Sequence, residues 1–233
     1  MAREAAWAQA PGDVRALDRA LAGTGFGVEN LLRRHAREAQ AQARAGAQGG
    51  PFVPDDARPA PGQWDRLQRA LMVLPLAAPL AQYEVTSGYG RRRDPINRRA
   101  AMHTGIDLRA PLRAPVAATA PGRVVFAGRK GGYGRVVEVD HGLGVRTRYA
   151  HLSRITVRVG QAVALGGRVG LLGSTGRSTG PHLHYEVLVD GRPRNPQPFL
   201  KAGARLSDSA LLATGRRDRD NRASPNSRGC PCP

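Results

Sequence analysis

The 233-residue chain is long enough for one well-buried domain with appendages. Only 5% of its residues are aromatic, whereas it holds 29 glycines and 18 prolines. This composition favours short strands joined by tight turns over a helical bundle. Both cysteines, Cys230 and Cys232, lie close to the end of the chain. A disulfide framework and a thiolate zinc site are therefore excluded from the body of the chain.

The formal net charge of +18 is concentrated in the middle of the chain. Residues 83–200 carry 19 basic and 7 acidic side chains, whereas residues 1–82 carry 10 and 8. Such a surface attracts polyanions, including nucleic acid, anionic lipid and an acidic cell wall. However, 34 of the 36 basic residues are arginine, an excess that a GC-rich genome also produces. No interleaved aromatics, helix-turn-helix or zinc-finger pattern accompanies the charge, so we expect no nucleic-acid binding.

Targeting segments are not visible in the sequence. The apolar run over residues 71–80 is too short to cross a bilayer and is interrupted by Pro75 and Pro79. The first residues lack the basic start and apolar stretch of a signal peptide. A location in the cell envelope would therefore require an export signal or a membrane anchor upstream of these residues.

The first third of the chain is expected to be helical. A helix capped by Asp13 is predicted where apolar residues recur at helical spacing up to Leu21, and glycines within residues 23–27 end it. A second helix begins at Val28, and its apolar stripe fades after Leu32, which is typical of an exposed or coiled-coil-like helix.

These patterns divide the N-terminal region into three parts. We interpret residues 1–48 as a helical extension or stalk. Residues 49–62 are rich in Pro, Gly and Asp and are predicted to be a linker. Residues 63–78 begin with a third helix, in which Trp64 and Leu67 share one apolar stripe that we expect to pack on the domain that follows.

From residue 79 the pattern changes to short apolar runs separated by turn residues. The predicted strands are residues 83–87, 115–119, 122–127, 135–140, 145–149, 169–173 and 182–189. This even spacing favours a mostly antiparallel all-β domain over residues 79–200. Residues 201–233 form a basic tail that we expect to be disordered, apart from a possible helical turn at 206–212.

Four histidines and one aspartate suggest a metal site. His182 and His184 alternate along the last predicted strand, so both project from one face. His103 and Asp107 are four residues apart and would share a face of an extended segment. Zinc takes imidazole nitrogen and carboxylate oxygen, and a catalytic site keeps three protein ligands plus water. His103, Asp107 and one of the two later histidines would form such a set, which leaves the other one and His151 to move protons.

The order of these motifs resembles the LytM/lysostaphin-type zinc metallopeptidases, the M23 family of peptidoglycan endopeptidases. The similarity includes residues 87–92 before the first histidine and residues 173–181 before the last pair, and it extends over about residues 83–200. The resemblance implies a barrel-sandwich fold with the metal in a groove on a sheet face.

The resemblance also implies roles for the five residues. His103, Asp107 and His184 would bind Zn²⁺, while His151 and His182 would assist proton transfer and stabilise the oxyanion. The implied activity is hydrolysis of peptide cross-links or stem peptides of peptidoglycan in the cell envelope. By analogy with Gram-negative enzymes, we expect the location to be the periplasm. The alternative is a non-enzymatic module that binds cell wall or activates cell-wall amidases, as some relatives without ligands do. Every ligand position is retained here, which counts against that alternative.

Two other patterns compete with this interpretation. Residues 176–180 fit the G-x-S-x-G motif of serine hydrolases, but Pro181 and a strand follow where that motif needs a helix. We therefore predict that Ser178 is a loop residue beside the groove. His141 is assigned to a turn between strands, and Asp140 lacks the four-residue spacing to an imidazole.

Overall fold

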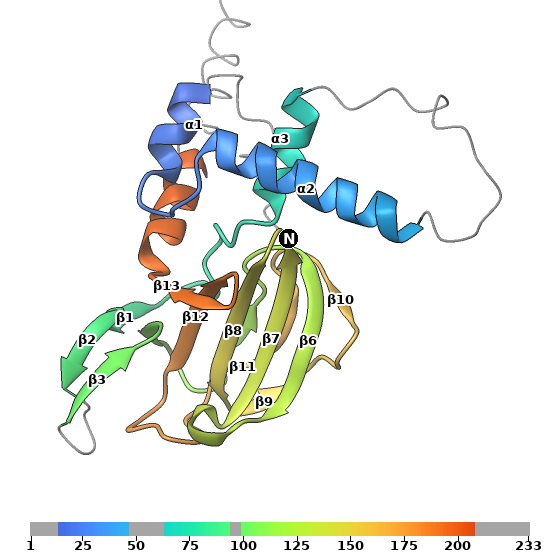
Figure 1. The fold of residues 1–233 in the computed structure, drawn as a ribbon. Helices are drawn as coiled ribbons and strands as arrows, with labels where there is room; N and C mark the ends of the chain where they lie inside the picture. Colours follow the sequence, from blue (N-terminus) through green and yellow to red (C-terminus); the bar gives the residue numbers. More distant parts are fainter. Residues whose placement is uncertain (1–13, 47–62, 94–98, 208–233) are drawn as a thin grey trace, which may run out of the picture.

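Three antiparallel sheets form the β part of the chain in the computed structural model, which describes residues 14–46, 63–93 and 99–207. The largest sheet has the strand order β1-β4-β12-β8-β7-β6-β10, and β13 pairs with β12 beside it (Figure 1). Its strands are β1 (Glu84–Ser87), β4 (Ile106–Arg109), β12 (Leu183–Val189), β8 (Val145–Leu152), β7 (Arg135–Gly142), β6 (Gly122–Arg129), β10 (Ala162–Val163) and β13 (Arg192–Arg194).

Two smaller sheets complete the arrangement. The strands β5 (Pro115–Ala117), β11 (Arg168–Leu171) and β9 (Arg154–Ile155) form one, and β2 (Gly90–Arg93) and β3 (Ala100–His103) form a hairpin. The all-β, mostly antiparallel prediction for this region is confirmed, with sheets that pack in a sandwich-like manner and do not close into a barrel.

All seven predicted strands are present, with ends that shift by up to a few residues. The strands that the sequence did not indicate are β2, β3, β4, β9, β10 and β13. They are only two to four residues long, and β2 and β13 are rich in arginine, so any alternation is too brief to be recognised as a strand. Pairing with neighbours rather than local pattern therefore determines them.

The interior between the sheets contains a hydrogen-bonded polar chain. Tyr149 and Tyr185 are fully buried with ring centroids 5.5 Å apart, and both hydroxyls lie within 3.0 Å of Thr119 Oγ1. Thr147 Oγ1 lies 2.9 Å from the Tyr149 hydroxyl and 2.8 Å from Nε2 of His141. The side chains of this polar group form hydrogen bonds with one another, so their burial in the core costs little free energy.

The helices gather at one end of the large sheet, at the top of Figure 1. They are α1 (Val14–Leu21), α2 (Val28–Gly46), α3 (Gln63–Met72) and an unnumbered helix over residues 197–207. Phe26 packs edge-on against Phe199 at 6.1 Å, and Arg34 binds both the carbonyl of Leu143 and the carboxylate of Asp190. The predicted helices are confirmed, and the first two form an extension packed on the β domain. None of the helices described is both long enough and apolar enough to span a membrane.

One predicted boundary is wrong. The tail was expected to begin at residue 201, but the last helix continues to residue 207 and buries Ala202 and Leu206. This segment is held by apolar contacts with the helical end of the domain. Its polar composition did not indicate that it would be ordered. The Asp13 cap, the linker over 49–62 and the rest of the tail, with Cys230 and Cys232, lie outside the described residues.

His141 should make stability depend on pH. Its ring is buried, with Nδ1 2.8 Å from the carbonyl oxygen of Pro121, and burial lowers its pKa in the folded protein. The unfolded chain therefore takes up a proton at a higher pH than the folded protein does, and stability is lost as pH falls below about 6.5. We expect the free energy of unfolding to fall more between about pH 7.5 and about pH 5 in the wild type than in His141→Gln. Urea unfolding at both pH values measures this, and an equal pH dependence in the two proteins would contradict it.

Candidate metal centre

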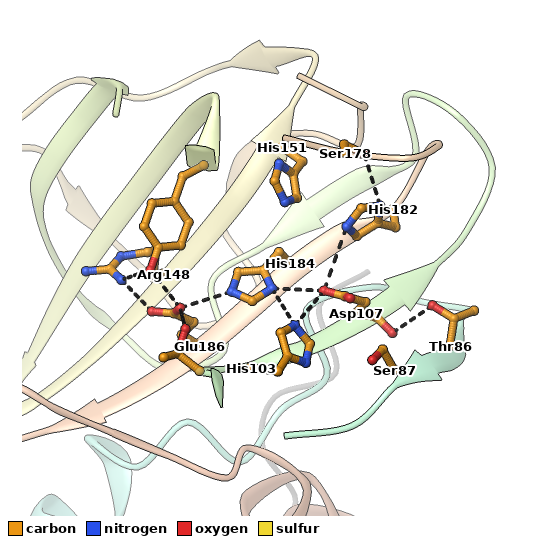
Figure 2. A network of polar contacts seen from close by, with 12 residues as sticks. Thr86, Ser87, His103, Asp107, Arg148, His151, Ser178, His182, His184 and Glu186 are labelled. Carbon is orange, nitrogen blue, oxygen red and sulfur yellow. Dashed lines mark hydrogen bonds and ion pairs between the residues drawn. The ribbon is translucent and has the colours of Figure 1, made fainter. Parts of the chain in front are cut away.

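The register between β4 and β12 brings two polar side chains together. His184 lies directly opposite Asp107 in this antiparallel pair, so both project from the same face. His184 Nδ1 is 2.8 Å from Asp107 Oδ1. His103, at the end of β3, completes the cluster because its Nε2 is 3.1 Å from both of these atoms. The three side chains are 6–9% exposed and point toward one another (Figure 2).

The path between His103 and Asp107 differs from the prediction. The two residues were expected on one face of an extended segment, but they belong to different strands in different sheets. The chain turns at Gly105, where a Cβ would collide with the carbonyl oxygen of Tyr185. This close approach to β12, which only glycine permits, places Asp107 beside His184. The predicted convergence is correct, but a turn produces it.

The remaining ring nitrogens fix the tautomers of the two histidines. His103 Nδ1 is 2.6 Å from the carbonyl oxygen of Gly88, which can only accept, so this nitrogen carries the proton. His184 Nε2 donates in the same way to the carboxylate of Glu186 at 3.0 Å. Two nitrogen lone pairs and one carboxylate oxygen then face one another. Such a set repels itself unless a cation or a proton lies between its members, and it is a donor set that zinc takes.

Electrostatics of the cluster agree with this donor set. Burial alone would raise the pKa of Asp107, but hydrogen bonds from His103 and His184 bring it well below its usual range. Burial would lower the pKa of His184, and hydrogen bonds to Asp107 and Glu186 raise it instead. Both shifts favour a proton shared within the cluster when no metal ion is bound, and a metal ion would replace that proton. Asp107 Oδ2 is 3.3 Å from Arg92 Nη2, which leaves Oδ1 for the ion.

His151 reaches the same face through an irregularity in β8. Strand alternation would place it with Thr147 and Tyr149 in the interior. However, the register between β7 and β8 shifts at this point, and His151 has φ of 60°. A β-bulge of this kind re-aims a side chain. His151 Nδ1 is 2.8 Å from the carbonyl oxygen of Thr175, and burial lowers the pKa of its ring to about 4.

His182 lies beside His151, with ring centroids 4.8 Å apart. Its Nδ1 is 2.8 Å from the carbonyl oxygen of Gly180, and its Nε2 is 3.7 Å from Asp107 Oδ1. The group of residues that could hold a metal ion contains His184 and not His182. The structure thus brings all five predicted site residues together, and it separates them into three clustered donors and two adjoining imidazoles (Figure 2).

These side chains line an open cleft of about 820 Å³. Arg92 and Met102 of the β2–β3 hairpin form part of its wall, and Ser178 lies in the loop opposite, as predicted. His141 and the described helices contribute nothing to this cleft. Residues 94–98 of the hairpin lie outside the described part of the chain.

Several residues of the site were missed by the sequence analysis. Tyr133 was not singled out, but it lines the cleft, with its ring centroid 5.8 Å from that of His184. Glu186 was passed over as well, although it continues the alternation that starts at His182 and so belongs on the same face. Arg92 lies within the family motif over residues 87–92 but was given no role, because the strand that places it beside Asp107 was not predicted.

Comparisons with known proteins agree with the site. Residues 101–196 match Peptidase family M23. Over 118 residues the chain is 50% identical to the DD-carboxypeptidase/endopeptidase Mpg of Neisseria meningitidis serogroup B, which covers 51% of this chain and 27% of that protein. Over 146 residues it is 43% identical to the peptidoglycan DD-endopeptidase ShyA of Vibrio cholerae serotype O1, and this match covers 62% of this chain and 33% of that protein. The catalytic domain of lysostaphin from Staphylococcus simulans is 37% identical with a TM-score of 0.48, covering 51% of this chain and 92% of that one.

The fold and the site define a β domain whose cleft contains three clustered donors that could hold a metal ion. The chain belongs to peptidase family M23. The family resemblance of its sequence motifs is confirmed. The chain spans about a third or less of the length of the two sequence relatives named here.

Metal binding should follow the three clustered donors. We expect about one zinc ion per chain in the wild type and loss of that zinc in His103→Ala, Asp107→Asn and His184→Ala. Asp107→Asn is the sharpest of these because it preserves the shape of the side chain and removes only its charge. His141→Gln is the matched control and should retain zinc, since His141 lies outside the cleft. Elemental analysis of dialysed protein measures the ratio, and full zinc in Asp107→Asn together with His184→Ala would contradict the assignment.

Proposed function

We propose that the M23 domain of this chain is a zinc-dependent endopeptidase that hydrolyses peptide cross-links or stem peptides of bacterial peptidoglycan. The observation that carries the proposal is the convergence of His103, Asp107 and His184 in an open cleft, with two further imidazoles beside them. A module that acts only through binding has no need for this arrangement. The proposal places the protein in the cell envelope, and the periplasm is the finer expectation.

The donor atoms suit the chemistry of amide hydrolysis. His103 Nε2, Asp107 Oδ1 and His184 Nδ1 would hold the zinc ion. When bound, zinc supplies a Lewis acid that polarises an amide carbonyl and makes water a better nucleophile near neutral pH. Two neutral imidazoles and one carboxylate leave the ion with a net positive charge, which this chemistry requires.

His151 and His182 are suited to hold and move protons. A backbone carbonyl fixes the proton of each ring on Nδ1, at Thr175 and Gly180 respectively. Each Nε2 therefore presents a lone pair that can accept a proton from an attacking water and return it to the leaving amine. Burial keeps His151 uncharged at neutral pH, because its pKa is lowered to about 4. Protonated in turn, either ring can donate a hydrogen bond to developing negative charge on the substrate oxygen.

The names of the relatives and the cleft support the substrate class. Both Mpg and ShyA are named as endopeptidases, and ShyA specifically as a peptidoglycan DD-endopeptidase. The cleft is open and has arginines at its edge, which suits an extended peptide that carries carboxylates. A peptidoglycan stem peptide has this character.

The direct assay is release of new amino groups from purified peptidoglycan. We expect the wild-type chain to release them, a zinc chelator to abolish the release and added zinc to restore it. Serine-directed covalent reagents should leave the rate unchanged, because Ser178 is a loop residue bonded to the carbonyl of Gly180. Zinc-loaded protein that releases no amines from peptidoglycan would contradict the proposal and favour a binding module.

Separate removal of the two proton-handling rings tests their role. His151→Ala and His182→Ala should each reduce kcat/KM by about 10²–10⁴-fold, the usual contribution of general acid-base catalysis. Both variants should retain zinc, since neither ring belongs to the three clustered donors. Loss of zinc from both variants, measured in the same samples, would show that the division of roles is wrong.

A further inference from the structure

Glu186 is a fully buried carboxylate next to the metal centre. It lies two residues beyond His184 on β12, so it projects from the same face of the sheet, and it is 0% exposed. A buried charge is strongly unfavourable unless hydrogen bonds and opposite charges surround it. The neighbours of this side chain therefore indicate what the protein uses it for.

The partners of Glu186 divide between its two oxygens. Oε1 is 3.0 Å from His184 Nε2 and 3.0 Å from the Tyr133 hydroxyl, and it also accepts from the hydroxyl of Thr104. Oε2 accepts from Arg148 Nη1. One carboxylate thus contacts a metal ligand, a residue of the cleft wall and the turn that follows His103. Figure 2 shows the line from Arg148 through Glu186 to His184.

Charges of alternating sign continue this line across the sheet. Glu186 lies opposite Arg148 of β8, and Arg148 lies opposite Glu138 of β7. Arg148 Nε is 2.9 Å from Glu138 Oε1, and Lys130 Nζ is 2.9 Å from the same oxygen. The row ends at Lys130, which is partly exposed. Cross-strand pairs of opposite charge stabilise the sheet and keep Glu186 ionised without a direct path to solvent.

The two imidazole ligands use different nitrogens. His103 presents Nε2 and His184 presents Nδ1, and in each ring the opposite nitrogen is tied to an acceptor. For His103 the acceptor is a backbone carbonyl, which no side-chain substitution removes. For His184 it is Glu186. Rotation of the His184 ring would break this bond and turn Nδ1 away from Asp107.

We propose that Glu186 is a positioning residue that orients His184 for metal binding and holds Tyr133 against the cleft through the same oxygen. The inference rests on the proposed function, because it gives the cluster a zinc ion to bind. An ionised acceptor on Nε2–H also increases electron density on Nδ1 and so strengthens the bond to the metal. The role is indirect, since Glu186 contacts neither the cleft nor the donor oxygen of Asp107.

The test measures zinc affinity of the full chain by competition with a chromogenic chelator. Glu186→Ala should raise the zinc dissociation constant by about 10–100-fold, the usual effect of removing such a partner of a metal-binding histidine. Glu186→Gln keeps an oxygen acceptor and loses only the charge, so its effect should be smaller. Asp140→Asn is the matched control. The Asp140 carboxylate accepts hydrogen bonds from Arg146 and from the amide of Gly142 at the far end of β7. The zinc affinity of this variant should therefore equal that of the wild type.

Cobalt(II) substitution gives a second readout. The visible absorption bands of the cobalt form should change in Glu186→Gln and stay unchanged in Asp140→Asn, because only the first substitution removes the charge from a group that is hydrogen-bonded to a metal-binding histidine. If Glu186→Ala does not fold, as judged by circular dichroism, Glu186→Gln decides. Wild-type affinity and an unchanged cobalt spectrum in Glu186→Gln would overturn the inference. A wild-type chain that binds no zinc would instead overturn the proposed function, so the two failures are distinguishable.

Discussion

The pairing register of β4 against β12 is the constraint on which the site depends. It places Asp107 opposite His184 and, with the turn at Gly105, delivers His103 to the same point. Because side chains alternate along a strand, a slip of one residue would turn His184 and Glu186 into the interior and Tyr185 out of it. The buried neighbours Leu183, Tyr185 and Val187 resist such a slip, so core packing and ligand geometry select the same register.

The two faces of the large sheet carry different kinds of polar side chain. The inner face carries Thr147, Tyr149 and Tyr185 of the hydrogen-bonded polar chain, and the two tyrosine hydroxyls meet Thr119 in the segment that follows β5. The outer face carries Asp107 and His184 of the three clustered donors and the charged row that runs from Glu186 to Lys130. His151 crosses from one set to the other only because β8 is irregular there, and its left-handed backbone costs of order 1–3 kcal/mol. The surrounding pairs hold this strained position, which brings a second imidazole beside His182.

Sequence reasoning predicted the long strands, because apolar runs between turn residues are a local signal. It also predicted the convergence of the five site residues, because the order of their motifs resembles that of a known family. It could not supply the means of that convergence. The turn at Gly105 depends on a close contact with Tyr185 of β12, which lies far away in sequence, and the bulge at His151 depends on a register shift against β7 that no residue pattern indicates. The structural roles of individual arginines were also not predicted. Composition accounts for their number, but Arg34, Arg92 and Arg148 each hold a specific carboxylate, and only tertiary structure assigns these pairs.

The claim that three residues share one metal ion can be tested by anomalous diffraction from crystals of the full chain, collected on either side of the zinc absorption edge. We predict a single anomalous peak at about 2.0–2.2 Å from His103 Nε2, His184 Nδ1 and Asp107 Oδ1. A peak at a different set of side chains, or none in crystals grown with zinc, would contradict this account.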